Sequence, residues 1–232
     1  MPQNIFITGV PKSGKTTLLE KLANELTSRD LKVCGFVSPD EKHSGKRTKF
    51  YVKDIRTGKN AILADINGDG PKVNKYKVNI KSFESICIPA LEDFENCDVV
   101  IIDEIGLMES KSNKFLDLLD QILESNIPLV AILHNNLTDK YGVNGQIYYL
   151  TEDNRSELME ELLEKIRSMK KKENIIQQSM ITKKSKKPKA QIKIKSKKQI
   201  EKQEIEEEIH SEEKTQHKKG GLLEKIRELL GI

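Results

Sequence analysis

A phosphate-binding loop is the first feature of this chain whose residue types could do chemistry. Residues 9–16 read Gly-Val-Pro-Lys-Ser-Gly-Lys-Thr, the spacing G-x-x-x-x-G-K-[ST], and an apolar run at residues 5–7 precedes them directly. A strand leading into such a loop lets consecutive backbone N–H groups converge on phosphate oxygens, and the positive end of the following helix attracts the same negative charge. Phosphate is therefore the expected ligand, bound by Gly9, Val10, Pro11, Lys12, Ser13, Gly14, Lys15 and Thr16, with Thr17 as a further hydroxyl.

Two residues of the loop have separate expected roles. Lys15 is placed to reach the β- and γ-phosphates, and the Thr16 hydroxyl is placed to coordinate Mg²⁺. The alternative is a glycine turn that only joins a strand to a helix. We disfavour it, because a plain turn gives no reason for Lys15 and Thr16 to stand side by side.

An acidic pair supplies the second half of a possible catalytic site. Residues 99–102 are four consecutive β-branched apolar residues, typical of a strand buried on both faces of a parallel sheet, and Asp103 and Glu104 follow them. Open α/β sheets bind ligands at the carboxyl ends of their strands. We therefore predict that Asp103 holds Mg²⁺ and that Glu104 is the general base that activates water. Taken alone, such a pair is also typical of a helix N-cap or a solvated loop. The phosphate-binding loop upstream favours the catalytic interpretation.

Charge divides the 232 residues into two parts. The chain is 33% charged and 36% hydrophobic, so a single compact domain is not expected to use all of it. Residues 170–232 hold 18 Lys and Arg against 10 Asp and Glu, a net charge of +8, which leaves −4 for residues 1–169. We predict a globular domain over residues 1–169, a disordered basic-then-acidic tail over 170–219, and a short amphipathic helix over 220–232.

The cysteines and the apolar runs indicate in which cellular compartment the protein is expected. Cys34, Cys87 and Cys97 are odd in number and lack metal-like spacing, which argues against a disulfide framework or a zinc site. No run approaches the roughly 18 apolar residues of a spanning helix, and no secretory signal pattern begins the chain. We expect a soluble protein of the reducing cytoplasm without a membrane span.

The apolar pattern predicts alternating strands and helices. Strands are expected at residues 4–8, 32–38, 99–102, 128–133 and 146–150, and helices at 15–29, 82–95 (kinked or split by Pro89), 113–124 and 153–168. Residues 40–48 are expected to be a polar loop, residues 49–55 and 60–64 a β-hairpin, and residues near 76–80 a strand after a second polar loop. The fold class is α/β, a mostly parallel sheet with helices on both faces and an inserted hairpin.

Several of these segments together resemble a known family. They are Ile7-Thr8-Gly9 through Thr17, Gly35-Phe36, Gly45-Lys46-Arg47, Asp103-Glu104-Ile105-Gly106-Leu107-Met108-Glu109, and Thr151-Glu152-Asp153-Asn154-Arg155. The chain resembles the small P-loop nucleoside-triphosphatase family, which includes thermophile nucleoside-triphosphatases and the cancer-related nucleoside-triphosphatase. The resemblance covers residues 2–169, and its D-E-I-G-x-M-E string is more specific than the phosphate loop. It implies a RecA-like P-loop domain that hydrolyses ATP, GTP and other nucleoside triphosphates with Mg²⁺.

The resemblance also assigns an arginine and marks departures from the family pattern. Arg47 matches the second arginine of the family's G-G-R-R segment, where it would stabilise charge on the transferred phosphoryl group. Lys46 replaces the first arginine, and lysine lacks the bidentate fork of arginine. Lys49 stands where the family usually has glycine. Lys12 lies in a segment that is usually Pro-Gly-Val in the family, so this lysine adds a positive charge beside the expected phosphates.

Four other residues have two interpretations each. His134 either touches the γ-phosphate or water, or is a structural histidine. Asn154 and Arg155 either line the base or ribose pocket, or cap the last helix and carry surface charge. Glu109 either supports the site indirectly or is a surface acid.

The basic tail also has two interpretations. Residues 183–198 hold nine lysines and no aromatic residue, and residues 201–213 are mainly acidic. Such a segment is either a solvated linker or a weak contact for RNA, DNA or a protein, without base stacking. The helix at 220–232 could dock on its own domain, pair with a copy of itself, occupy a partner's groove or, with less support, bind a membrane surface.

The leading hypothesis is a Mg²⁺-dependent nucleoside triphosphatase with Glu104, Lys15 and Arg47 in catalysis, acting as a monomer. One alternative is a phosphoryl transferase of the nucleotide or polynucleotide kinase kind. Another is a nucleotide-dependent binding module whose tail recruits nucleic acid or a protein. The base preference has no readable code in the sequence.

Overall fold

The computed structural model describes residues 4–43 and 46–185. Met1–Met180 form one compact unit. Of the second unit, Ile181–Ile232, the structure describes only the residues up to 185, which end the last helix. The predicted terminal helix at 220–232 and the tail beyond residue 185 lie outside the described residues.

Five parallel strands form the half of the sheet that carries the phosphate loop. Their order is β10-β1-β9-β8-β2, with bounds Gly145–Tyr149, Asn4–Thr8, Leu129–Leu133, Val99–Ile105 and Val33–Val37. Every neighbouring pair in this order is parallel. Strands β1, β2 and β9 are buried at every residue, as their continuous apolar sequences predict. These five strands confirm the predicted parallel core.

An antiparallel extension continues the sheet from β2. Its strands are β4 (Lys46–Asp54), β5 (Asn60–Asp65), β7 (Tyr76–Val78) and β6 (Lys72–Val73), and β3 (Asp40–His43) pairs with β4 off this path. The predicted hairpin is β4 paired antiparallel with β5. It belongs to a larger structure than expected, because three further strands complete it.

The predicted polar loop over residues 40–48 is wrong, because β3 and the first part of β4 occupy it. The two strands pair antiparallel, for example through Asp40 with Phe50. Strand β3 pairs with β4 off the main strand order, and the residues of β3 and residues 46–49 are all polar or charged, so apolar and polar residues do not alternate along the ribbon. Without that alternation the sequence has no strand signal.

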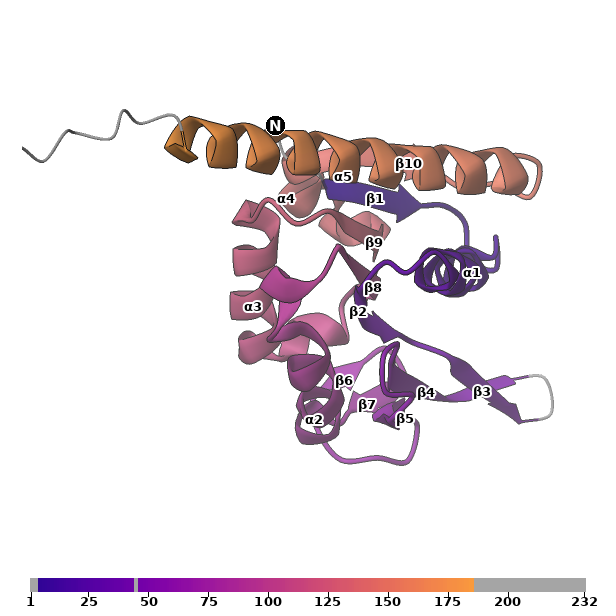
Figure 1. The fold of residues 1–232 in the computed structure, drawn as a ribbon. Coiled ribbons are helices and arrows are strands. Elements are labelled where there is room, and N and C mark those ends of the chain that lie inside the picture. Colours follow the sequence, from indigo (N-terminus) through magenta and orange to yellow (C-terminus); the bar gives the residue numbers. More distant parts are fainter. Residues whose placement is uncertain (1–3, 44–45, 186–232) are drawn as a thin grey trace, which may run out of the picture. The chain divides into compact units, whose positions relative to one another are not determined.

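Helices cover both faces of the parallel strands, as predicted. Helices α1 (Lys15–Ser28) and α5 (Arg155–Ser185) pack on one face, and α2 (Ile80–Leu91) and α3 (Asn113–Glu124) pack on the other. In Figure 1, α1 and α3 lie on opposite sides of β8. Alternate residues of β1 serve the two layers, since Phe6 joins the α2–α3 core while Ile5 and Ile7 join the α1–α5 core.

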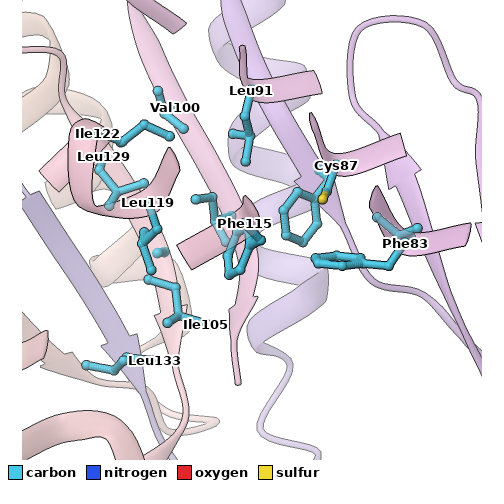
Figure 2. Packing of buried hydrophobic residues seen from close by; sticks show 14 of the residues in the cluster. Phe83, Cys87, Leu91, Val100, Ile105, Phe115, Leu119, Ile122, Leu129 and Leu133 are labelled. Atoms are coloured by element: carbon cyan, nitrogen blue, oxygen red, sulfur yellow. The ribbon is translucent and has the colours of Figure 1, made fainter. Parts of the chain in front are cut away.

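Aromatic side chains dominate the core under α2 and α3. Figure 2 shows Phe83 and Phe115 among the aliphatic side chains of β8 and β9. Their rings are 5.5 Å apart in an edge-to-face arrangement, and Phe36 of β2 lies 5.6 Å from Phe83. This cluster anchors both helices to the strand that precedes the antiparallel extension.

Element boundaries differ from prediction at three places. The strand near 76–80 ends at Val78, because Asn79 caps α2 by accepting a hydrogen bond from the Ser82 N–H at 3.0 Å. The helix predicted for 82–95 is α2, with Pro89 inside it, followed by the 3₁₀ turn η1 (Phe94–Asn96). The last helix continues to Ser185 instead of ending near residue 168.

Short helical turns complete the fold: η2 (Glu109–Lys111), η3 (Asn135–Leu137), α4 (Thr138–Tyr141) and η4 (Gly142–Asn144). No helix in the described ranges is long and apolar enough to cross a membrane.

Candidate active site

A cavity of about 780 Å³ opens where the parallel strands end. It brings together most of the residues predicted for the site, namely Gly9, Pro11, Lys12, Gly14, Lys15, Thr16, Thr17, Arg47, Asp103 and Glu104. Val10 and Ser13 belong to the same loop but do not line the cavity. The topology explains this convergence, because β1 and β8 run parallel and deliver the phosphate loop and the acids to one edge of the sheet.

The phosphate loop leaves its backbone donors available. Gly14 caps α1 with φ 91°, a left-handed conformation that suits glycine. Within the described residues no side chain caps α1, and its first turn holds no acid. The N–H groups at this end therefore remain for an anion. The Ser13 hydroxyl is buried and has no partner among the described residues.

Lys15 lies folded onto its own loop. Its Nζ donates to the carbonyl oxygens of Gly9 and Val10, each at 2.9 Å. Burial lowers the pKa of Lys15, while the nearby Glu104 and Asp103 carboxyl groups raise it. In this conformation the ammonium is bound to the carbonyl oxygens of its own loop.

A β-bulge in β8 brings both acids to the cavity. Ile102 pairs with Ala131 of β9, but the next paired residue is Ile105 with Leu133, so β8 has one residue more than its partner between these pairs. In a regular strand the adjacent Asp103 and Glu104 would point to opposite faces. The bulge re-aims them, and both line the cavity. The peptide bond between them is cis.

Asp103 is buried and bound by two neighbours. Its Oδ1 accepts from the Thr16 hydroxyl at 3.3 Å, and its Oδ2 accepts from the Ser38 N–H at 3.2 Å. Burial raises the pKa of Asp103 to about 7, although both hydrogen bonds act to lower it. Thr16 and Asp103 thus present a pair of hard oxygen donors on the phosphate side of the cavity.

Glu104 lies beside a second acid, Glu109. Burial raises the pKa of Glu104, while its electrostatic interactions with His134, Lys15 and Arg47 act to lower it. Glu109 is 5% exposed, and burial together with the nearby Glu104 raises its pKa well above the ordinary range. Glu109 is therefore not a surface acid, and a supporting role in the site stays a prediction.

Arg47 reaches the cavity from the antiparallel extension. Its Nε forms an ion pair with Asp40 across the β3–β4 ribbon, and its guanidinium carbon lies 5.9 Å from the Phe50 ring centroid. Its charge acts on both Lys15 and Glu104. The strand pairing of residues predicted to be a loop thus places this cation opposite the phosphate loop.

His134, Asn154 and Arg155 separate into different roles. His134 lines the cavity, and its Nδ1 accepts from the Asn136 N–H at 3.2 Å. Asn154 caps the turn before α5, because its Oδ1 accepts from the Thr151 N–H at 2.9 Å and its Nδ2 donates to the Tyr149 carbonyl at 2.9 Å. Arg155 instead extends to the phosphate loop and donates from Nη2 to the Ser13 carbonyl oxygen at 2.8 Å.

Sequence reasoning missed several residues of the cavity. Ser38 orients Asp103 through its backbone N–H, and its position just after β2 was a signal, since β2 neighbours β8. Four further missed residues come from β4 and from β6–β7, namely Phe50, Val73, Asn74 and Tyr76. They had no local signal, because strand pairing over long separations brings them to the cavity.

Comparisons with known proteins agree with this geometry. The model of a protein family described as NTPase matches residues 4–163. The nucleoside-triphosphatase THEP1 of Methanocaldococcus jannaschii is 42% identical over 164 residues, which are 70% of this chain and 96% of that protein. The THEP1 of Pyrococcus abyssi is 39% identical over 165 residues, covering 71% of this chain and 92% of that one.

Two solved structures are similar as well. The crystal structure of THEP1 from Aquifex aeolicus has a TM-score of 0.60 at 32% identity, covering 68% of this chain and 96% of that one. The solution structure of a human cancer-related nucleoside triphosphatase has a TM-score of 0.60 at 27% identity, and the match covers 71% of this chain and 97% of that one.

Proposed function

The chain belongs to the NTPase family and is a nucleoside-triphosphatase, and from this premise we propose that it hydrolyses nucleoside triphosphates, ATP and GTP among them, to diphosphate and phosphate with Mg²⁺. One observation carries the proposal. The bulge in β8 turns two adjacent carboxyl groups into the cavity that the phosphate loop lines. A binding site for phosphate alone would not need the second acid.

The residues present fit a magnesium ion. Thr16 and Asp103 supply two oxygen atoms 3.3 Å apart. Among the residues that the structure describes, no group of three or more His, Cys, Asp or Glu side chains is arranged to hold a metal. This agrees with the way Mg²⁺ is usually bound, through one or two protein oxygens with substrate phosphates and water completing the shell. The ion would supply positive charge to the β- and γ-phosphate oxygens.

Glu104 is the proposed base for the attacking water. The carboxylate must be ionised to accept a proton, and the nearby cations Lys15 and Arg47 favour that form against the effect of burial. Lys15 and Arg47 are proposed to stabilise charge on the γ-phosphate as its bond to the diphosphate breaks. For Lys15, this requires its Nζ to leave the carbonyl oxygens of the loop.

The test is release of inorganic phosphate by the purified full chain from a panel of nucleoside triphosphates. We expect turnover with Mg²⁺, loss of turnover with a chelator, and recovery when Mg²⁺ is restored. Turnover that is unaffected by the chelator would contradict the magnesium proposal. The panel also measures which base the enzyme prefers. This selectivity depends on loops whose sequence does not predict it.

A second candidate is a phosphoryl transferase, and one observation favours it. Besides the phosphate loop and the acidic pair, side chains of β4 and β6–β7 line the cavity, which leaves room for a second substrate. Phosphorylation of a second substrate by the wild-type chain would distinguish transfer from hydrolysis.

The tail is not part of the domain that this chain shares with its relatives. The THEP1 relatives are matched over more than nine tenths of their length by about seven tenths of this chain, so the residues after about 170 are additional to the shared domain. A contact of the tail with nucleic acid or protein, and a monomeric state, stay predictions.

A further inference from the structure

The cavity has a second end that the triphosphate does not explain. We call it the distal chamber and define it by Phe50, Val73, Asn74, Tyr76, Leu107 and Met108, all of which line the cavity. Phe50 comes from β4, Val73 to Tyr76 form the β6–β7 turn, and Leu107 and Met108 follow β8. The chamber is therefore built mainly by the antiparallel extension rather than by the strands that hold the phosphate loop.

The orientation of the substrate separates its nucleoside from this chamber. In a phosphate loop, Lys15 and Thr16 bind at the β–γ end, and the γ-phosphate faces the catalytic acids. Glu104 and Arg47 are therefore expected at the γ end. The chamber adjoins them along the chain, because Phe50 lies on β4 with Arg47 and Leu107 follows β8, which carries Glu104. On this orientation the nucleoside is expected at the other end of the loop, near Gly14 and Arg155, whose Nη2 donates to the Ser13 carbonyl oxygen. Of the described residues that line the cavity, none comes from the 151–155 segment.

The chamber has the chemistry of a site for a planar ring. The rings of Phe50 and Tyr76 stand edge to face with centroids 4.9 Å apart, and Val73 and Met108 add aliphatic surface. The Tyr76 hydroxyl donates to the Arg47 carbonyl at 3.1 Å, which turns the polar end of this ring away from the apolar wall. An aromatic ligand would meet ring edges and aliphatic carbons there.

Polar groups at the chamber favour an uncharged ligand. Asn74 is exposed and has φ 53°, so its amide stands at the β6–β7 turn with one donor and one acceptor group for a ring edge. Arg47 lines the cavity and already pairs with Asp40. Lys75 is exposed, and although its Nζ lies 5.2 Å from the Tyr76 ring centroid, it does not line the cavity. The Glu104 carboxylate, the proposed base, lies next to the chamber and would repel an added phosphate.

We propose that the distal chamber binds a second ligand, an uncharged planar ring compound of nucleoside size, with a hydroxyl directed at Glu104. The inference deepens the proposed function and rests on it for the position of the γ-phosphate. A bound hydroxyl takes the place of the attacking water. If this hydroxyl is the phosphoryl acceptor, Glu104 takes the hydroxyl proton and the hydroxyl oxygen bonds to the γ-phosphorus. The bond between that phosphorus and the diphosphate oxygen then breaks.

The experiment measures nucleoside binding to the full chain saturated with Mg²⁺ and a non-hydrolysable triphosphate analogue, which blocks the first nucleotide site. Adenosine, guanosine, cytidine and thymidine are titrated by calorimetry, with ribose and the matching monophosphates as comparisons. We expect at least one nucleoside to bind, ribose not to bind, and the monophosphate to bind more weakly than its nucleoside. A monophosphate that binds more tightly would overturn the uncharged class, and absence of nucleoside binding would overturn the site.

Three variants test the location. Phe50→Leu keeps an apolar side chain but removes the ring, and should weaken nucleoside binding about tenfold. Asn74→Gly removes the amide while allowing the positive φ, and should weaken binding several-fold. Tyr51→Phe is the matched control on β4, since the Tyr51 hydroxyl donates to Glu41 and does not line the cavity. Equal affinity in wild type, Phe50→Leu and Asn74→Gly would place any bound nucleoside elsewhere and contradict the proposal.

The same samples separate this inference from the proposed function. Phosphate release without nucleoside, together with no nucleoside binding, contradicts the distal chamber alone. Nucleoside binding without any phosphate release contradicts the hydrolytic function alone. With a hydrolysable substrate, a phosphorylated nucleoside identifies an acceptor, whereas slower phosphate release identifies a ligand that displaces water; either supports the site.

Discussion

Arg155, the first residue of α5, donates a hydrogen bond from Nη2 to the carbonyl oxygen of Ser13 in the phosphate loop at 2.8 Å. A Cβ on Gly14 would lie 2.9 Å from the Arg155 guanidinium carbon, so this glycine is what allows the arginine to approach. The contact joins residues that are distant in the sequence. It makes the start of α5 a support for the conformation of the loop.

The first prediction concerns this support. Arg155→Ala removes a charged donor from a loop carbonyl, which typically costs about 1.5–3 kcal/mol. We expect the loop to lose its fixed conformation and nucleotide affinity to fall at least about tenfold, measured by titration with a non-hydrolysable analogue. The matched control is Arg167→Ala on the same helix, whose side chain pairs only with Glu164 at 4.0 Å. Equal affinity in both variants would contradict the support.

Lys12 gives a prediction that separates charge from backbone conformation. It has φ 69°, lies exposed, and lines the cavity beside the phosphates. Lys12→Gly and Lys12→Ala both remove the charge and should weaken nucleotide binding alike. Only glycine adopts the left-handed conformation freely, so Lys12→Gly should be more stable than Lys12→Ala by about 1 kcal/mol. Chemical denaturation and nucleotide titration measure the two effects, and a variant pair that differs in affinity but not in stability would contradict the assignment.

The pH dependence of hydrolysis follows from Glu104. Burial raises the pKa of this carboxyl group above its ordinary value of 4.5. A general base works only when ionised, so kcat/KM should fall as the pH falls through the raised pKa. The acid limb of a pH–rate profile for the wild-type chain should therefore lie above pH 4.5. An acid limb at or below that value would indicate that another group limits the rate.

Glu109 gives a prediction on stability. Burial raises its folded-state pKa, so the folded protein binds this proton more tightly than the unfolded chain. The resulting stabilisation is present below the ordinary pKa of about 4.5 and is lost as the pH rises through the folded pKa. Glu109→Gln cannot lose a proton, so its stability relative to wild type should increase from pH 4 to pH 8. Thermal unfolding of both proteins over this range measures the difference, and a constant difference would contradict the buried, titrating acid.

The sequence predicted the parts of the site that are local. The phosphate loop and the acidic pair are short motifs on continuous apolar strands, and a parallel sheet necessarily brings such strand ends together. A helix was predicted near residues 113–124, and α3 has the bounds Asn113–Glu124. In the structure Ser112 caps it, because its hydroxyl accepts from the Phe115 N–H at 3.1 Å.

The parts that the sequence could not predict depend on pairing between distant residues. The bulge at Asp103 and Glu104 is defined only by the register of β8 against β9. The β3–β4 ribbon is charged and lacks alternation, so its strands resembled a loop. Arg155 had no signal for its contact with Ser13, because helix capping explains an arginine at that position equally well.

The most direct test of the central claim compares wild type with Glu104→Gln in a single-turnover assay, with enzyme in excess over γ-labelled substrate and Mg²⁺ present. The amide keeps the shape of the side chain but accepts no proton. We predict that the variant binds the nucleoside triphosphate with an affinity close to that of wild type and releases phosphate at least about a hundredfold more slowly. A Glu104→Gln variant that releases phosphate within a few-fold of the wild-type rate would contradict the account.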